Sequence, residues 1–279
     1  MTEEDMRRFS NTWSLMKSSF QVLKEDTAVL LFPVLSGIFT LIIIASFLLP
    51  FFATGNLSSL QFLENQPGFI GYLYLFLFYF LSYFVVLFFN SASVVYAIDV
   101  MRGGNPTVSS AVKMVSHRIT PLLGWTFIAA TVGLIINSIE NSSDSVGKIF
   151  SAFLGLSWTV ISFLVLPILI VEGHGPVTSL KLSAEMLKNS WGEQLIGHFS
   201  FGLIFAVLSF PICLIIFLGL QYGGAAAIVG IITGVLLILG MGVVQWSLQS
   251  IFMGAMYLFV REEKIPPSYS LSQISNAFH

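Results

Sequence analysis

The sequence contains very little charge. Asp, Glu, Lys and Arg together make up 9% of its 279 residues, and the mean hydropathy is +0.88. Soluble globular domains carry about 25% charged residues, so this composition excludes a soluble domain. The formal net charge is −2 and the basic residues are dispersed along the chain. That pattern excludes nucleic acid as a partner, because nucleic-acid binding requires a clustered basic surface.

Cysteine and catalytic motifs are equally scarce. Cys213 is the sole cysteine, so neither an intramolecular disulfide nor a cysteine-based zinc site can form. The chain has no H-E-x-x-H zinc motif, no G-x-S-x-G nucleophile motif, no phosphate-binding loop and no dinucleotide fingerprint. We therefore expect a protein that is not an enzyme and that holds no cofactor or metal. One alternative stays open: Glu172, His174 and His198 would suit a lipid-modifying enzyme if the fold brought them within ligand distance.

Long apolar segments account for most of the chain. A helix needs about 20 apolar residues to cross a hydrocarbon core of roughly 30 Å. Backbone polar groups must be paired inside lipid, and these segments lack the alternation of barrel strands. The sequence therefore predicts an all-α, polytopic membrane bundle of six transmembrane helices, within a single integral membrane domain over 1–279. None of the six segments contains Asp, Glu, Lys or Arg; they cover approximately 28–52, 69–97, 121–139, 149–171, 195–219 and 225–260.

The last apolar segment, 225–260, is too long for one perpendicular crossing of the membrane. Glycine stands at positions 240 and 242 within it. We expect the segment to tilt, to break near Gly240 and Gly242, or to emerge into the aqueous phase.

The positive charges lie on one side of the predicted membrane. Eleven of the twelve Lys and Arg residues fall before the first segment, between the second and third, between the fourth and fifth, or after the sixth. Only Lys148 falls on the opposite side. Because short loops rich in Lys and Arg stay in the cytoplasm, we predict a protein of the cytoplasmic membrane with both termini cytoplasmic.

Three predicted cytoplasmic stretches have the apolar spacing of amphipathic helices. In each, apolar residues stand 0, 4, 7 and 11 positions after the first one, which places them on one helix face. The three sets are Phe9, Trp13, Met16 and Phe20, then Val108, Val112, Val115 and Ile119, then Leu180, Ala184, Leu187 and Trp191. Each stretch precedes a pair of apolar segments. We therefore predict three parallel repeats of helix plus hairpin, approximately 7–104, 105–174 and 175–264.

A few polar and small residues interrupt the apolar segments. The deepest polar residues are Asn90, Asn137, Gln245 and Gln249. They indicate either hydrogen bonds between helices or the lining of a polar permeation path. Ala226, Gly230 and Gly234 recur every four residues, which predicts a ridge for close helix packing, within the bundle or between protomers.

Five blocks carry a family resemblance: FSNTWSLMKSSF at 9–20, LLFPVLSG at 30–37, FNSA at 89–92, GGNPT at 103–107 and VEGHGP at 171–176. They resemble an uncharacterised family of prokaryotic six-helix integral membrane proteins, and the resemblance covers nearly the whole chain. It implies a six-helix membrane fold and supplies no functional residues. The plan of surface helix plus hairpin is also similar to the membrane domains attached to some glycerophosphodiester phosphodiesterases. No phosphodiesterase domain is present in this sequence, so that activity is not expected.

The expected function is that of a membrane-organising or assembly component. It would contact membrane lipid, a protein partner or a second copy of itself through the cytoplasmic helices, with Trp13, Phe20 and Trp191 as anchors. The alternative is a channel or permease for a small solute, which would pass the polar groups named above. The two differ in whether those polar side chains converge on a water-accessible cavity.

Overall fold

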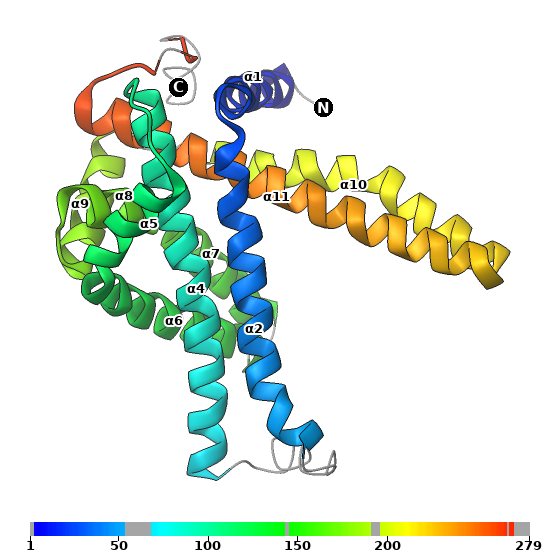
Figure 1. Cartoon of the computed structure of the whole chain (residues 1–279). Helices are drawn as coiled ribbons and strands as arrows, with labels where there is room; N and C mark the ends of the chain where they lie inside the picture. The colour runs from blue at the N-terminus through cyan, green and yellow to red at the C-terminus, as the bar shows by residue number, and fades with distance from the viewer. Residues whose placement is uncertain (1–2, 54–67, 143–144, 191–195, 267, 271–279) are drawn as a thin grey trace. The chain divides into compact units, whose positions relative to one another are not determined.

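The computed structural model describes residues 3–53, 68–142, 145–190, 196–266 and 268–270, and every regular element within those ranges is a helix (Figure 1). The long helices are α2 (Leu31–Ala53), α4 (Phe69–Met101), α6 (Ile119–Ser142), α7 (Ser145–Ser162), α10 (Ile196–Tyr222) and α11 (Gly224–Glu262). The other elements are α1 (Glu3–Glu25), η1 (Thr27–Leu30), α5 (Val108–His117), α8 (Val165–Pro167), the π-helix η3 (Ile168–Glu172) and α9 (Pro176–Ser190).

Among the described residues, six helical stretches are long and apolar enough to cross a membrane. They coincide with the six segments expected from the sequence, so the prediction of an all-helical fold with six long apolar helices is confirmed, and these helices fit a membrane protein. The stretches are Thr27–Pro50, Phe69–Met101, Ile119–Asn141, Gly147–Glu172, Ile204–Tyr222 and Gly224–Glu262.

The sequence predicted one helix over 149–171. The structure instead divides this segment into several helical pieces. After α7 the chain makes a short turn and continues as α8 and the π-helix η3. Pro167 explains the interruption, because it has no N–H to donate and its ring clashes with the carbonyl four residues earlier. The N–H of Leu164 is donated to Ser183 Oγ of α9 instead, at 3.1 Å.

The sixth segment forms a single helix, α11, of 39 residues. It passes through Gly240 and Gly242 without interruption, so the break that was one of three expected outcomes does not occur. A helix of that length extends about 58 Å, nearly twice the thickness of a hydrocarbon core of roughly 30 Å. Its buried residues are concentrated toward the C-terminal end, from Ser247 to Leu258.

The chain divides into two compact units. Unit 1 comprises Met1–Leu31, Tyr96–Pro106 and Glu185–His279, and unit 2 comprises Phe32–Val95 and Thr107–Ala184. Unit 1 therefore contains α1, the last turns of α4, α10 and α11. Unit 2 contains most of α2 and α4, together with α5 to α8 and most of α9.

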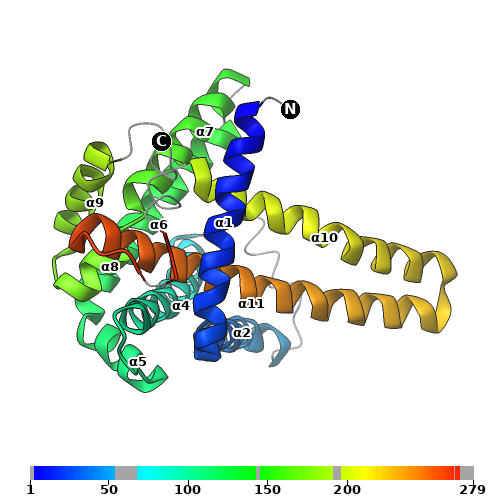
Figure 2. The same cartoon turned by 90° about the horizontal axis from the view of Figure 1, so that it is seen from above.

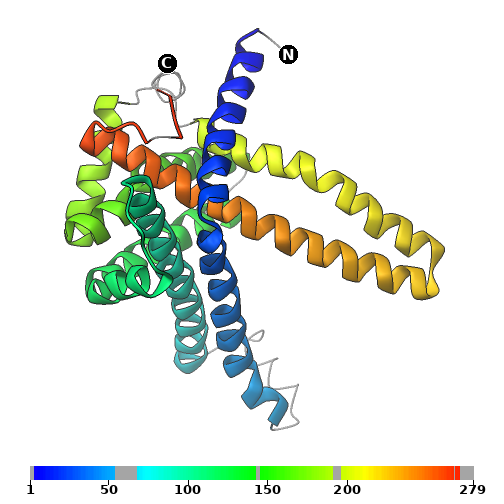
Figure 3. The ribbon, with the colours of Figure 1, turned by 45° about the horizontal axis from the view of Figure 1, so that its top comes forward.

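In unit 1, α10 and α11 form a long antiparallel hairpin, and α1 crosses both of its helices rather than running beside them (Figures 2 and 3). Away from that crossing, most apolar side chains of the hairpin are exposed, with Val207 and Phe210 on α10 and Leu236 on α11 among them. An exposed apolar surface of that extent suits contact with lipid rather than with water.

Glycines hold the hairpin together by letting its two backbones touch. A Cβ atom placed on Gly230 of α11 would lie 3.0 Å from Gly219 Cα and 3.2 Å from the carbonyl oxygen of Ile215, both on α10. A Cβ on Gly234 would collide with the side chain of Ile216. The glycines of the predicted ridge of Ala226, Gly230 and Gly234 therefore pack against α10 within the hairpin. The sequence left open packing within the bundle or between protomers, and these glycines pack within the bundle.

In unit 2, aromatic rings form the contacts between α2 and α4, which run antiparallel (Figure 1). The Phe47 ring on α2 lies 4.9 Å from the Tyr74 ring and 5.4 Å from the Phe78 ring, measured between ring centres. Phe39 lies 5.4 Å from Phe89 in the same way. These rings set the spacing of the two helices.

A second helix pair of unit 2, α6 and α7, is joined by stacked indoles. The Trp125 and Trp158 rings lie 5.7 Å apart with an angle of 18° between their planes. Trp125 is buried. An offset stack of this kind adds to the stability that the buried area alone provides.

Candidate functional site

The helix α1 has two distinct faces. Its inner face is buried, and α1 packs against α10 and α11. The buried residues are Leu15, Met16, Ser18, Ser19, Val22 and Leu23. On the outer face, the large rings of Trp13 and Phe20 are 50% and 41% exposed. The packing of the inner face thus fixes which aromatic side chains point outward.

Four outer residues, Trp13, Lys17, Phe20 and Lys24, form a continuous line that we call the α1 stripe. At roughly 100° per residue they fall within an arc of about 60°. Both lysines are exposed, and Lys24 Nζ lies 5.0 Å from the centre of the Phe20 ring, a cation–π arrangement. Sequence reasoning missed the two lysines, although their spacing of 0, 4, 7 and 11 with the aromatics was a readable signal.

The predicted apolar face of α1 is split in two. Met16 is buried, whereas Trp13 and Phe20 from the same predicted set are exposed. Met16 stands at the border of the inner face, and the neighbouring helices cover that border. The side chain of Phe9 and the third predicted anchor, Trp191, lie outside the residues that the structure describes.

In the other two predicted amphipathic helices, residues of the predicted apolar sets also lie in different settings. In α5, Val115 is buried, but Ile119, just past its end, is 42% exposed. Among the side chains of α9 that the structure describes, Ser179 and Ser183 are buried, while Leu180 is only half-buried. Small hydroxyl side chains let α9 approach the start of α8 closely, where Ser183 accepts a backbone hydrogen bond.

Hydrogen bonds fix α1 at both its middle and its end. Asp26 follows α1; its Oδ1 accepts from the N–H of Ala28 at 2.9 Å, and its Oδ2 accepts from the Tyr96 hydroxyl at 2.6 Å. The first bond caps the start of η1, and the second links Asp26 to Tyr96 near the end of α4. The Ser19 hydroxyl lies 2.7 Å from the Tyr269 hydroxyl. These bonds hold the orientation in which the stripe is exposed.

Residues 263–266 and 268–270, which we call the C-terminal strap, return from the end of α11 to α1. Tyr269 is buried against Ser19, and Ser268 Oγ donates to Glu25 Oε1 at 3.3 Å. Burial raises the pKa of the Tyr269 hydroxyl above its ordinary value, and the hydrogen bond with Ser19 opposes that shift only in part.

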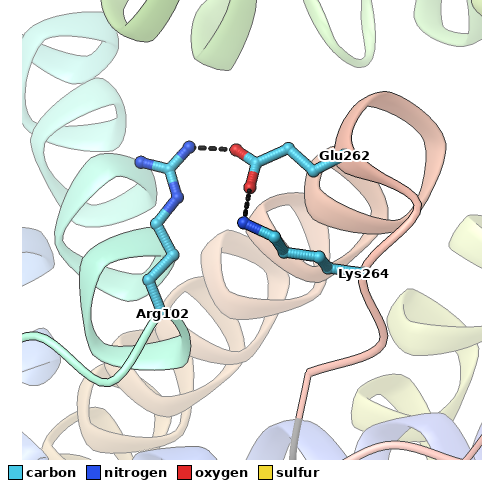
Figure 4. A network of polar contacts seen from close by, with 3 residues as sticks. All are labelled: Arg102, Glu262 and Lys264. Atoms are coloured by element: carbon cyan, nitrogen blue, oxygen red, sulfur yellow. Dashed lines mark hydrogen bonds and ion pairs between the residues drawn. The ribbon is translucent and has the colours of Figure 1, made fainter.

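Three charged side chains meet where α4 and α11 end (Figure 4). Arg102 and Lys264 both bond to the Glu262 carboxylate, with Lys264 Nζ at 3.0 Å. They border an open pocket of ≈ 360 Å³, whose other lining residues are Met101, Leu258, Ile265 and Pro266. The carboxylate neutralises one of the two cations, and the C-terminal ends of two helices add partial negative charge. The cluster is therefore a clamp between helix ends rather than an anion site.

The polar residues that suggested a permeation path lie in different settings. Asn137 on α6 is exposed, and its Oδ1 accepts from Asn141 Nδ2 on the same helix at 3.1 Å. Asn90 on α4 is half-buried in unit 2. Gln245 and Gln249 are half-buried one turn apart on α11 in unit 1. Asn137 therefore bonds within its own helix.

Two of the three residues of the enzymatic alternative, Glu172 and His174, form a carboxylate–imidazole pair at the end of the fourth segment. His174 Nε2 lies 3.3 Å from Glu172 Oε2. Between them, Gly173 adopts a left-handed φ of 76° beside the Arg118 guanidinium, where a Cβ would collide. The side chain of His198 lies outside the described residues. Within the described part of the chain, no three His, Cys, Asp or Glu residues gather as a metal site.

One family model matches this sequence, over residues 69–265, and its description is a family of unknown function, DUF6159. No curated protein and no solved structure matches the chain. The expected membership of an uncharacterised family is confirmed by this match. The expected likeness to membrane domains of glycerophosphodiester phosphodiesterases finds no support in the comparisons.

Proposed function

The chain belongs to the DUF6159 family, and on that premise we propose that it is a non-enzymatic, multi-pass protein of the cytoplasmic membrane that organises lipid at the cytoplasmic surface. The α1 stripe is the surface that contacts phospholipid headgroups. The observation that carries the proposal is the exposure of Trp13 and Phe20 beside two lysines, on a helix whose opposite face is buried.

The chemistry of the α1 stripe matches the headgroup layer of a bilayer. Tryptophan and phenylalanine insert their rings at the boundary between acyl chains and headgroups, while lysine extends its ammonium toward phosphate. Two lysines are fewer than the clusters of four or more that recognise strongly anionic lipid. The aromatic rings therefore supply most of the binding, and the lysines orient the helix.

The crossing of α1 over the hairpin supports the same placement. If α10 and α11 span the membrane, a helix that crosses both of them lies along the membrane surface (Figure 2). Because α1 packs on the hairpin through its inner face, its outer face points away from the hairpin, toward neighbouring lipid. A protein partner or a second copy of this chain is the competing occupant.

The positive charges and the order of the helices support the remaining parts of the proposal. Eleven of twelve basic residues on one side favour cytoplasmic termini. The order α1, α2, α4, then α5, α6, α7, then α9, α10, α11 favours three parallel repeats, each with an amphipathic cytoplasmic helix followed by two spans.

Spin labels on α1 test the lipid contact in the full chain reconstituted in lipid nanodiscs. Cys213→Ser provides the background, and single cysteines replace Trp13, Phe20 or Gln21. We expect labels at positions 13 and 20 to collide more often with oxygen, which partitions into lipid, than with a water-soluble nickel chelate. The label at exposed Gln21, about 100° away from Phe20 on the helix, is expected to show the reverse order.

Two results would overturn the lipid contact. Preferential collision with the nickel chelate at positions 13 and 20 would place the stripe in water. Low collision rates with both reagents would mean that protein covers it. Replacing Trp13 and Phe20 together with serine is expected to weaken lipid retention during purification, and unchanged retention would also count against the proposal.

A further inference from the structure

Buried hydroxyl groups without a partner gather on α2 and α4 of unit 2. The oxygens of Ser36 and Thr40 on α2, and of Ser82 and Ser93 on α4, have no hydrogen-bond partner among the described residues. Ser36 is 1% exposed and Ser93 is 0% exposed. A fifth such group, Ser179, belongs to α9. Leaving a buried hydroxyl unbonded is costly, so the four that share one helix pair call for a common explanation.

Several other buried hydroxyls of this protein bond to their own helix. Ser91 Oγ donates to the carbonyl of Leu87 at 2.8 Å, and Thr126 Oγ1 donates to the carbonyl of Leu122 at 2.8 Å. That bond to the residue four positions earlier is the usual solution for Ser and Thr inside a helix. The hydroxyls of the four orphaned residues do not make this bond to their own backbone.

All four residues lie on the surfaces that α2 and α4 turn toward each other, which we call the α2–α4 seam. On α2, Ser36 and Thr40 precede Phe47 by 11 and 7 residues, so they share its face. The Phe47 ring contacts rings of α4. On α4, Ser82 and Ser93 follow Phe78 and Phe89 by four residues each, and both of those rings contact α2.

The antiparallel register brings three of the hydroxyls to nearby levels. We take the contact between Phe39 and Phe89 as the reference. At 1.5 Å per residue, Ser36 lies about 4.5 Å and Ser93 about 6 Å beyond it toward the same end of the pair. Thr40 lies only about 1.5 Å to the other side. Ser82 lies further down the same seam.

We propose that the α2–α4 seam binds a cluster of water molecules, centred between Ser36, Thr40 and Ser93 and reaching toward Ser82. Aromatic side chains separate the two helices here, and the hydroxyls between them can each donate and accept one bond to water. A buried water needs two to four polar partners, which the three grouped hydroxyls supply. The seam has no charged side chain at these levels, so its occupant is neutral.

The proposed water cluster is a line of hydrated positions between α2 and α4, two apolar helices that are candidate membrane spans. It is independent of the proposed lipid contact, which rests on α1 in unit 1. Failure of either proposal leaves the other intact.

Cysteine reactivity measures hydration of the seam directly in the full chain in nanodiscs. In the Cys213→Ser background, Ser93→Cys is compared with Ala92→Cys, whose native residue is equally buried at 0% exposure. The thiolate is the reactive species and forms only where water can solvate it. We therefore expect Ser93→Cys to react with a small methanethiosulfonate reagent about tenfold faster than Ala92→Cys. Equal rates would overturn the proposal.

Thermal unfolding of alanine variants provides a second, independent readout. If water bridges the seam, Ser36→Ala and Ser93→Ala each lower the unfolding temperature, and the double variant loses less than the sum, because one bridge is lost in each case. If the hydroxyls are dry, each change raises the unfolding temperature and the effects add. Ser91→Ala corrects for the change in helix propensity, since Ser91 is buried on the same helix but bonds to its own backbone.

Discussion

The hairpin α10–α11 and the pair α2–α4 are both antiparallel pairs of long apolar helices, yet they pack in opposite ways. In α10–α11, Gly219 and Gly230 allow the two backbones to touch. In α2–α4, the Phe47 ring and its partners on α4 hold the backbones apart. Lipid offers no hydrophobic driving force between helices, so each pair depends on close contact. The α10–α11 hairpin makes that contact through its backbones, and the α2–α4 pair makes it through aromatic rings.

The difference decides where polar groups can lie. A glycine contact leaves no space between helices for water. In α2–α4, the orphaned Ser36 and Ser93 lie on the faces that carry the contacting rings, and this is where we place the water cluster. We therefore expect backbone packing to favour a dry pair and ring packing a hydrated one.

Breaking the glycine contact is expected to have the largest effect. Gly230→Leu places a side chain where Gly219 and the Ile215 carbonyl now lie, so α10 and α11 must separate. We expect a loss of about 3 kcal/mol in unfolding free energy, at the upper end for an overpacked site. Denaturant titration in mixed micelles measures it. Gly240→Leu is the matched control, since no atom lies near a Cβ there, and an equal loss in both variants would refute the contact.

Removing one ring of the α2–α4 seam is expected to have an intermediate effect. Phe47→Leu keeps an apolar side chain but loses ring contacts with Tyr74 and Phe78, which we expect to cost about 1–2 kcal/mol. The same titration reports the loss. Phe210→Leu on α10 removes a ring that is 72% exposed and is expected to change little. If both variants behave alike, rings do not set the α2–α4 contact.

The C-terminal strap is expected to give the smallest effect, and one that depends on pH. Folding raises the pKa of Tyr269, so the unfolded chain releases this proton first as pH rises. The stabilisation by the buried neutral hydroxyl is thus fully present below about pH 10 and declines above it. We expect wild type to lose stability relative to Tyr269→Phe between about pH 9 and pH 11. Parallel curves for the two proteins would show that Tyr269 makes no such contribution.

The long helices were predictable because membrane spans are specified by composition over about 20 residues. The interruption of the fourth span was only half predictable. Pro167 signals a break, but the Ser183 hydroxyl that receives the freed Leu164 N–H comes from another helix. A tertiary partner of this kind leaves no pattern in the local sequence.

The candidate site was predictable in its residues and not in its orientation. Apolar side chains occur on both faces of α1, Leu15 and Val22 on one and Trp13 and Phe20 on the other. The spacing of one helix cannot tell which face its neighbours will bury, because that depends on the surfaces of α10 and α11. The lysines of the stripe carried the missing information, since charged side chains are seldom buried without a partner.

The stacked indoles of Trp125 and Trp158 give the protein an internal optical reporter. Two parallel indoles at this separation couple their electronic transitions, and the resulting circular dichroism disappears when α6 and α7 part. The loss of order in unit 2 can thus be followed by circular dichroism in the native chain, without any added label.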